Sequence, residues 1–138
     1  MRIPRAALDS ILDRARKGYP FEVCGILLGR GARVESAREV QNREEHNPRT
    51  RYVIAPEDLL RIQRQSREQA LDIIGFYHSH PDHPAKPSET DRSLAAQGLS
   101  DGVFHMVVGV ERGETATPTA WVFRDRLGGF EAETLEVE

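Results

Sequence analysis

An apolar run that leads directly into two histidines constrains the fold of this chain more than any other stretch. Residues 71–77 form the run LDIIGFY, and His78 and His80 follow at once. Such a run predicts a buried strand, and side chains two positions apart on a strand point the same way. We therefore expect both imidazoles to face one point, at or just past the end of this strand.

A carboxylate follows the histidines at a distance that lets it reach the same point. The intervening loop is stiffened by prolines, and residues 88–91 resemble the start of a helix, which would deliver Asp91 to the histidines. Three protein ligands of nitrogen and oxygen type, with the fourth position left to water, are typical of a catalytic zinc site. We therefore predict one Zn²⁺ per chain, bound by His78, His80 and Asp91.

Composition narrows the class of protein. The 138 residues are enough for one domain with a core, so we expect a single domain over residues 1–138. A net charge of -3 gives no reason to expect binding to nucleic acid or to an anionic membrane. No apolar stretch approaches a membrane span and the first residues lack a signal-peptide pattern, so we expect a cytoplasmic protein. The single cysteine, Cys24, excludes an intramolecular disulfide and any zinc site built from paired cysteines.

The rest of the chain interleaves helical and strand patterns. Helices are predicted over about 4–18, 56–69 and from residue 88 to near 98–102. Strands are predicted over 21–29, 33–40, 52–54, 71–77, 104–110 and 119–123, with a turn at 111–118 and a tail that either adds an edge strand or frays. This order predicts an α/β architecture with a mixed sheet flanked by helices, although the strand order cannot be read from it.

Ser88 has two roles open to it. It precedes a predicted helix and stands three residues before Asp91, which resembles a capping box with Asp in place of the usual Glu or Gln. A hydroxyl can accept from a backbone N–H and still donate to an oxyanion near a metal. Asp91 could likewise be only a favourable anion in the first helical turn, but that position also suits an ionised metal ligand.

Hydrolysis of an amide needs a group that accepts a proton and delivers it to the leaving amine. Glu22 stands at the start of the predicted strand 21–29, which should neighbour the histidine strand. Taken alone it would be an exposed carboxylate at a strand end. Together with the metal ligands it is the best-placed general acid/base, and we predict that role for it.

The remaining histidines and the cysteine are not expected to bind the metal or to act as catalysts. His83, in the loop after the histidine strand, is a rival ligand but is expected to be a bystander or to face substrate. His46 and His105 have no visible partners and are predicted to be structural. Cys24 lies inside an apolar strand, where a cysteine usually acts as a small hydrophobe rather than a nucleophile.

These residues resemble the motif of the JAMM, or MPN-plus, metalloprotease family. His78, His80, Ser88 and Asp91 match the spacing of that motif without a gap, and Glu22 looks like the family's upstream glutamate. The resemblance implies a cytidine-deaminase-like α/β/α sandwich and a zinc ion held by the two histidines and the aspartate. It also implies that Glu22 is the general acid/base and that Ser88 helps to stabilise the tetrahedral intermediate.

The resemblance, which covers most of the chain to about residue 123, also implies a substrate class. The family cleaves peptide or isopeptide bonds after the C-terminal tail of ubiquitin or a ubiquitin-like protein. Compact bacterial members act on small sulfur carriers with a Gly-Gly tail, including carrier-cysteine adducts, and this short chain is expected to do the same. Two alternatives are a noncatalytic MPN-type scaffold that binds partner proteins and a deubiquitinase-like enzyme. A nucleotide deaminase is excluded because its two-cysteine signature is absent.

Overall fold

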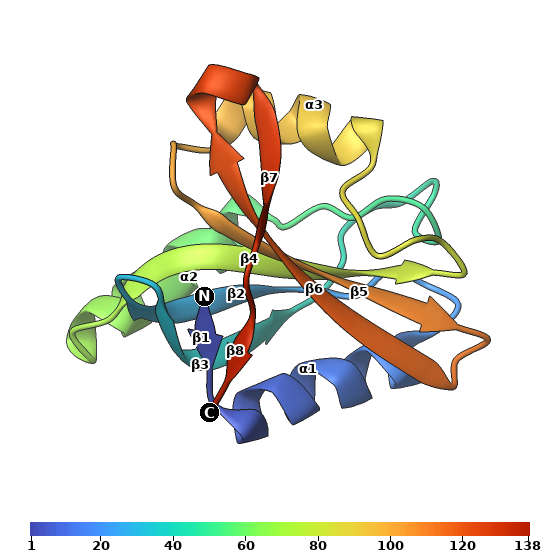
Figure 1. Cartoon of the computed structure of the whole chain (residues 1–138), viewed down its shortest axis with the longest axis horizontal. Helices are drawn as coiled ribbons and strands as arrows, with labels where there is room; N and C mark the ends of the chain where they lie inside the picture. The colour runs from blue at the N-terminus through green and yellow to red at the C-terminus, as the bar shows by residue number, and fades with distance from the viewer.

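The computed structural model describes all 138 residues. The chain forms a curled, eight-stranded mixed sheet with three helices packed around it (Figure 1). The helices are α1 (Arg5–Gly18), α2 (Pro56–Glu68) and α3 (Glu89–Gly98), with a short 3₁₀ turn at Asp125–Leu127. The strands are β1 (Arg2–Ile3), β2 (Cys24–Arg30), β3 (Arg33–Val40), β4 (Asp72–Pro81), β5 (Phe104–Glu111), β6 (Thr115–Arg124), β7 (Gly129–Glu133) and β8 (Glu136–Val137).

The strands lie in the order β7-β6-β5-β4-β2-β3-β1-β8. β4 occupies the centre, where it pairs antiparallel with β2 and parallel with β5. β1 and β8 run parallel at one edge, so the first and last strands of the chain lie side by side (Figure 1). The predicted mixed sheet flanked by helices is therefore confirmed, and the tail forms strands.

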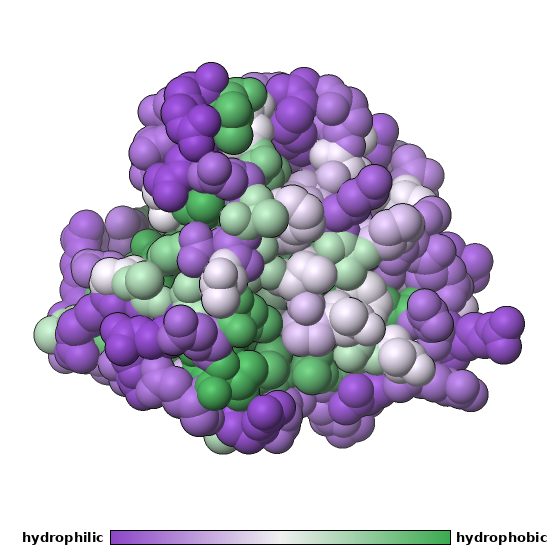
Figure 2. Space-filling view, in the orientation of Figure 1, coloured by the Kyte–Doolittle hydropathy of each residue, from purple (hydrophilic) through white to green (hydrophobic).

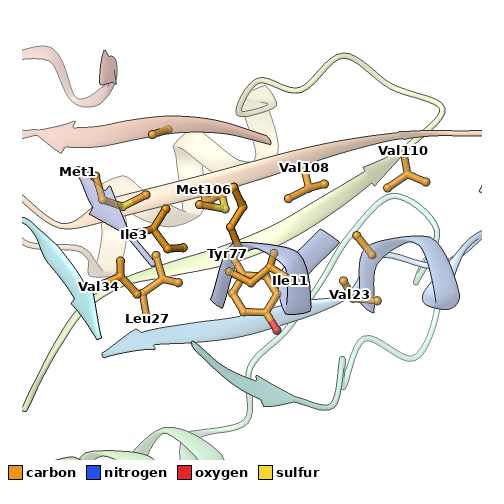
Figure 3. Packing of buried hydrophobic residues seen from close by; sticks show 13 residues of the cluster. Met1, Ile3, Ile11, Val23, Leu27, Val34, Tyr77, Met106, Val108 and Val110 are labelled. Carbon is orange, nitrogen blue, oxygen red and sulfur yellow. The ribbon is translucent and has the colours of Figure 1, made fainter. Parts of the chain in front are cut away.

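Side chains of β2 alternate between two cores on opposite faces of the sheet. On one face, Leu27 packs with Ile11 of α1 in a cluster of 13 buried residues (Figure 3). On the other face, Ile26 packs with Ile62 of α2 in a cluster of five buried residues. Polar residues cover most of the surface seen in Figure 2. None of the three helices combines the length and the apolar character that a membrane span requires.

The predicted strand at 52–54 does not form. Its backbone is held instead by Asn42, whose side chain accepts from Val53 N at 3.0 Å and donates to Arg51 O at 3.0 Å. The backbone N–H of Arg43 also donates to Val53 O at 2.9 Å. A polar side chain thus satisfies groups that a neighbouring strand would otherwise pair.

The predicted turn at 111–118 is too long. The hairpin turns within residues 112–114, and β6 begins at Thr115 and pairs Pro118 with Val108 of β5. Proline lacks an N–H and is tolerated where a strand has a free side. β7 pairs only with residues 120–124 of β6, so the outer side of Pro118 has no strand partner.

Candidate metal centre

The two histidines project from the last residues of β4. Pairing between β2 and β4 ends at Cys24 and His78, whereas β5 continues along β4 as far as Pro81. The histidines are buried, with His78 0% and His80 5% exposed. Their Nε2 atoms lie 3.0 Å apart, so the expectation that both imidazoles face one point is confirmed.

The first turn of α3 delivers Asp91 to these imidazoles. Ser88 caps the helix, because its Oγ accepts from Asp91 N at 3.0 Å and its own N–H donates to Asp91 Oδ2 at 2.8 Å. This completes the predicted capping box and fixes the rotation of the carboxylate. Asp91 Oδ2 lies 3.1 Å from His78 Nε2 and 3.1 Å from His80 Nε2.

The three converging atoms are spaced as ligands of one small cation would be. Zinc with bonds of about 2.0–2.1 Å in tetrahedral geometry separates its ligand atoms by about 3.3 Å. The outer nitrogens of both imidazoles are also engaged: His80 Nδ1 lies 2.8 Å from Pro84 O, and His78 Nδ1 lies 2.7 Å from His105 Nε2. Such partners orient histidine ligands in metalloproteins.

Glu22 enters the same site from the start of β2. Its backbone is held on both sides, with Glu22 N donating to Pro48 O at 2.8 Å and Asn42 Nδ2 donating to Glu22 O at 3.0 Å. The residue is only 3% exposed, so the alternative of an exposed carboxylate is wrong. Ligand atoms of Glu22, His78 and His80 lie within 4.8 Å of one another, and Glu22 Oε1 is buried without a hydrogen-bond partner.

The environments of the two carboxyl groups push their pKa values apart. Burial raises the pKa of Glu22 to about 8, an effect that the charge of His80 reduces and that of Asp91 reinforces. Burial would also raise the pKa of Asp91, but hydrogen bonds with His78 and His80 hold it well below its usual range. In the metal-free protein Asp91 is therefore ionised at neutral pH, whereas Glu22 favours its protonated form.

The expectation that His105 has no partner is wrong, because its Nε2 contacts His78 Nδ1. It lies on β5 opposite Phe76 of β4 and its ring contacts His78. Burial and the neighbouring His78 hold the pKa of His105 well below its usual value, so the ring is neutral. The sequence does indicate the face on which His105 lies, because His105 alternates with Met106 and Val108 along the predicted strand. Met106 and Val108 belong to the core beneath α1, so His105 lies on the other face of the sheet, with the site.

The remaining candidates do not join the converging side chains, although His83 lines the same groove as Glu22 and His80. His46 and His83 are exposed, and the ring centroid of His83 is 6.5 Å from that of His80. Cys24 is buried, and burial raises the pKa of its thiol to about 12. The prediction that Cys24 serves as a small hydrophobe agrees with its place in the core beside α2.

A polar groove opens in front of the site. It encloses about 410 Å³, and Glu22, His80 and Ser88 line it together with the basic side chains of Arg51 and Lys86. Pro84 and Pro87 also line this groove and supply apolar surface to it.

An apolar hollow of about 280 Å³ adjoins the other side of Asp91. Val53, Phe76, Leu94 and His105 contribute to its walls. Glu22 and His80 therefore border the polar groove, whereas Asp91 borders the apolar hollow.

Comparison with known proteins places this geometry in a family. The family model described as prokaryotic homologs of the JAB domain matches residues 4–124. The desampylase of Haloferax volcanii is 40% identical over 95 residues, which cover 65% of this chain and 68% of that protein. The CysO-cysteine peptidase of Mycobacterium tuberculosis is 27% identical over 90 residues, which cover 65% and 62% of the two chains. The crystal structure of a JAB1/MPN domain protein from Archaeoglobus fulgidus has the same fold, with a TM-score of 0.62, 23% identity and coverage of 99% and 98%.

The chain therefore belongs to the family of prokaryotic JAB-domain proteins. It is a peptidase of the JAMM type, as the predicted resemblance implied.

Proposed function

We propose that the protein is a zinc-dependent peptidase or isopeptidase that hydrolyses the amide bond after the C-terminal tail of a ubiquitin-like protein. The observation that carries the proposal is the convergence of His78 Nε2, His80 Nε2 and Asp91 Oδ2 at separations of 3.0–3.1 Å, with a buried, unpartnered oxygen of Glu22 beside them. This set suits a metal-dependent hydrolase better than a binding scaffold, which needs neither the ligands nor the base.

His78, His80 and Asp91 are the proposed ligands, with one Zn²⁺ per chain. Glu22 is also close enough to be considered, but the ionised Asp91 lies nearer to both imidazoles, and the raised pKa of Glu22 suits proton transfer. A zinc ion held there would act as a Lewis acid, lowering the pKa of water towards about 7 and polarising the scissile carbonyl. The unpartnered Glu22 Oε1 supports the proposal that a metal-bound water lies beside it, because buried polar atoms in proteins usually have a hydrogen-bond partner.

Glu22 is proposed to move protons during the reaction. Its carboxylate takes a proton from the attacking water and then delivers it to the nitrogen of the leaving amine. The pKa of about 8 in the metal-free protein shows that burial disfavours the charge, and a cation beside it would restore the ionised form. Burial and a cation would thus act in opposite directions on the pKa of Glu22, and a pKa set between these two effects is suited to both halves of this task.

Ser88 is proposed to donate to the oxyanion that develops on the substrate carbonyl. Its Oγ already accepts from Asp91 N, which leaves the hydroxyl hydrogen free to point into the groove. A donor positioned before the reaction stabilises developing charge without further reorganisation. The capping role and the catalytic role are therefore compatible.

The substrate is proposed to be a ubiquitin-like sulfur carrier with a Gly-Gly tail, including carrier-cysteine adducts. The support comes from relatives named desampylase and CysO-cysteine peptidase. Glycine residues have no Cβ, so a Gly-Gly tail could bring its backbone close to His80 and Ser88 in the groove.

The test combines one substitution with a mass measurement. Zinc-loaded protein is incubated with ubiquitin-like carriers extended beyond Gly-Gly, either by one cysteine or through an isopeptide bond to lysine. We expect release of carriers that end in Gly-Gly, with no cleavage when the two glycines are replaced by alanine. Glu22→Gln should abolish turnover while about one zinc per chain is retained. Glu45→Gln, at an exposed carboxylate, is the matched control and should behave as wild type.

If no Gly-Gly extended carrier is cleaved by zinc-loaded protein, the substrate assignment is wrong. If Glu22→Gln retains full turnover, Glu22 is not the group that transfers the proton.

A further inference from the structure

His105 contacts the outer nitrogen of one proposed ligand. His105 Nε2 lies 2.7 Å from His78 Nδ1, and the two residues are 27 positions apart in the chain. They are brought together because β4 and β5 pair in parallel, with Phe76 opposite His105. Both side chains are buried, with 0% and 3% exposure.

The chemistry of the ligand sets the direction of this hydrogen bond. A histidine that binds a cation through Nε2 has its lone pair there, so the proton of His78 must reside on Nδ1. His78 Nδ1–H then donates to His105 Nε2. His105 accepts through Nε2 and must carry its own proton on Nδ1.

That proton has no acceptor. His105 Nδ1 is buried and has no hydrogen-bond partner. A buried N–H without a partner lowers the stability of the folded state, so fold stability alone gives no reason for a histidine here. An apolar side chain would fill the same space without that loss.

We propose that His105 is a positioning residue for the metal centre, holding His78 as the Nδ1–H tautomer with its Nε2 lone pair aimed at the site. The proposal rests on the proposed function, since it requires His78 to be a ligand. Tyr52 holds the same imidazole on its face, with ring centroids 4.5 Å apart and an interplanar angle of 22°. Hydrogen bond and stacking together leave His78 one orientation.

The test separates metal affinity from fold stability. Zinc affinity is measured by competition with a chromophoric chelator, and thermal unfolding is followed in the metal-free protein. For His105→Leu we expect zinc affinity to fall about 10- to 100-fold, with a melting temperature equal to or above that of wild type. His105→Gln keeps an acceptor near the position of Nε2 and should restore affinity to within about threefold of wild type.

A matched control comes from a histidine away from the site. His46 is exposed, so His46→Leu makes the same change of side chain without touching His78. Zinc affinity should remain close to that of wild type. Cobalt absorption spectra should change for His105→Leu and stay unchanged for His46→Leu, because they report ligand geometry.

Two outcomes overturn different statements. If His78→Ala binds zinc as wild type does, the proposed metal centre is wrong. If His78→Ala loses zinc but His105→Leu keeps wild-type affinity, only the positioning role fails.

A measurement on the unsubstituted protein covers the case in which His105→Leu does not fold. In the zinc-loaded protein, ¹⁵N spectra should show the His78 proton on Nδ1 and a coupling across the hydrogen bond to His105 Nε2. A His78 imidazole without that coupling, or with its proton on Nε2, would overturn the proposal.

Discussion

Ser79 and Val23 join the two strands that carry the site, although 56 residues separate them. The Ser79 hydroxyl accepts from Val23 N at 2.9 Å, and Ser79 N donates to Val23 O at 3.0 Å. This pair continues the contact between β2 and β4 beyond the last paired residues, Cys24 and His78. It thereby fixes the position of Glu22 relative to the histidines.

Ser79→Ala should therefore weaken both the fold and the reaction. The substitution leaves a buried backbone N–H of Val23 without its side-chain acceptor, which costs about 1–3 kcal/mol in the free energy of unfolding. Turnover should fall because Glu22 is less well positioned, while zinc affinity changes little. Urea unfolding and carrier cleavage measure the two effects. The control, Ser100→Ala at an exposed serine, should match wild type in both; wild-type stability in Ser79→Ala would show that the pair contributes nothing.

Substitutions at Ser88 should separate its cap from its donor role. Ser88→Ala removes the cap of α3 and should lower the free energy of unfolding by about 1 kcal/mol. Ser88→Asp keeps a capping oxygen but has no hydroxyl hydrogen, so stability should stay within about 0.5 kcal/mol of wild type. Turnover should fall about 100-fold or more in both variants. Thermal unfolding, zinc content and cleavage rates are compared, and a fully active Ser88→Asp would rule out the donor role.

Gly25 is required by the approach of an aromatic ring. A Cβ at this position would overlap the Tyr77 ring, which packs in the core beneath α1. Gly25→Ala should lower the free energy of unfolding by about 1–3 kcal/mol. Gly98→Ala is the matched control, because a Cβ there meets nothing within 4 Å and the helical position favours alanine by up to about 1 kcal/mol. Equal stability of the two variants in chemical denaturation would contradict the role assigned to Gly25.

The stability of the metal-free protein should depend on pH through Glu22. The folded-state pKa is about 8, against 4.5 for the ordinary group, so between these values the folded state keeps a proton that the unfolded chain has lost. Stability therefore falls as pH rises through this range. Glu22→Gln lacks this contribution and should gain of the order of 2–4 kcal/mol relative to wild type between about pH 5 and about pH 8. Urea unfolding in chelator measures the difference, and identical pH profiles for the two proteins would refute the shift.

The parts of the site that depend on short-range geometry could be predicted from the sequence. His78 and His80 share a face because a strand repeats every two residues, and Asp91 follows Ser88 at the spacing of a capping box. The structure brings the atoms of these three proposed ligands to 3.0–3.1 Å from one another, as their spacing suggested. The architecture followed in the same way from the alternation of helix and strand patterns.

The parts that depend on strand order could not be predicted. His105 reaches His78 only because β5 lies beside β4, and nothing in residues 104–110 states which strand is their neighbour. The role of Asn42 could not be predicted either, because its side chain takes the place of a strand partner for Arg51 and Val53, nine and eleven residues further on. Long-range pairing, rather than local pattern, decides these contacts.

A zinc-edge anomalous diffraction map of the zinc-loaded crystal would locate the ion. We predict one peak per chain, at about 2.0–2.1 Å from His78 Nε2, His80 Nε2 and a carboxylate oxygen of Asp91. Glu22 should lie close by without binding the ion. A peak coordinated by Glu22 in place of Asp91, or no peak between the two histidines, would contradict this prediction.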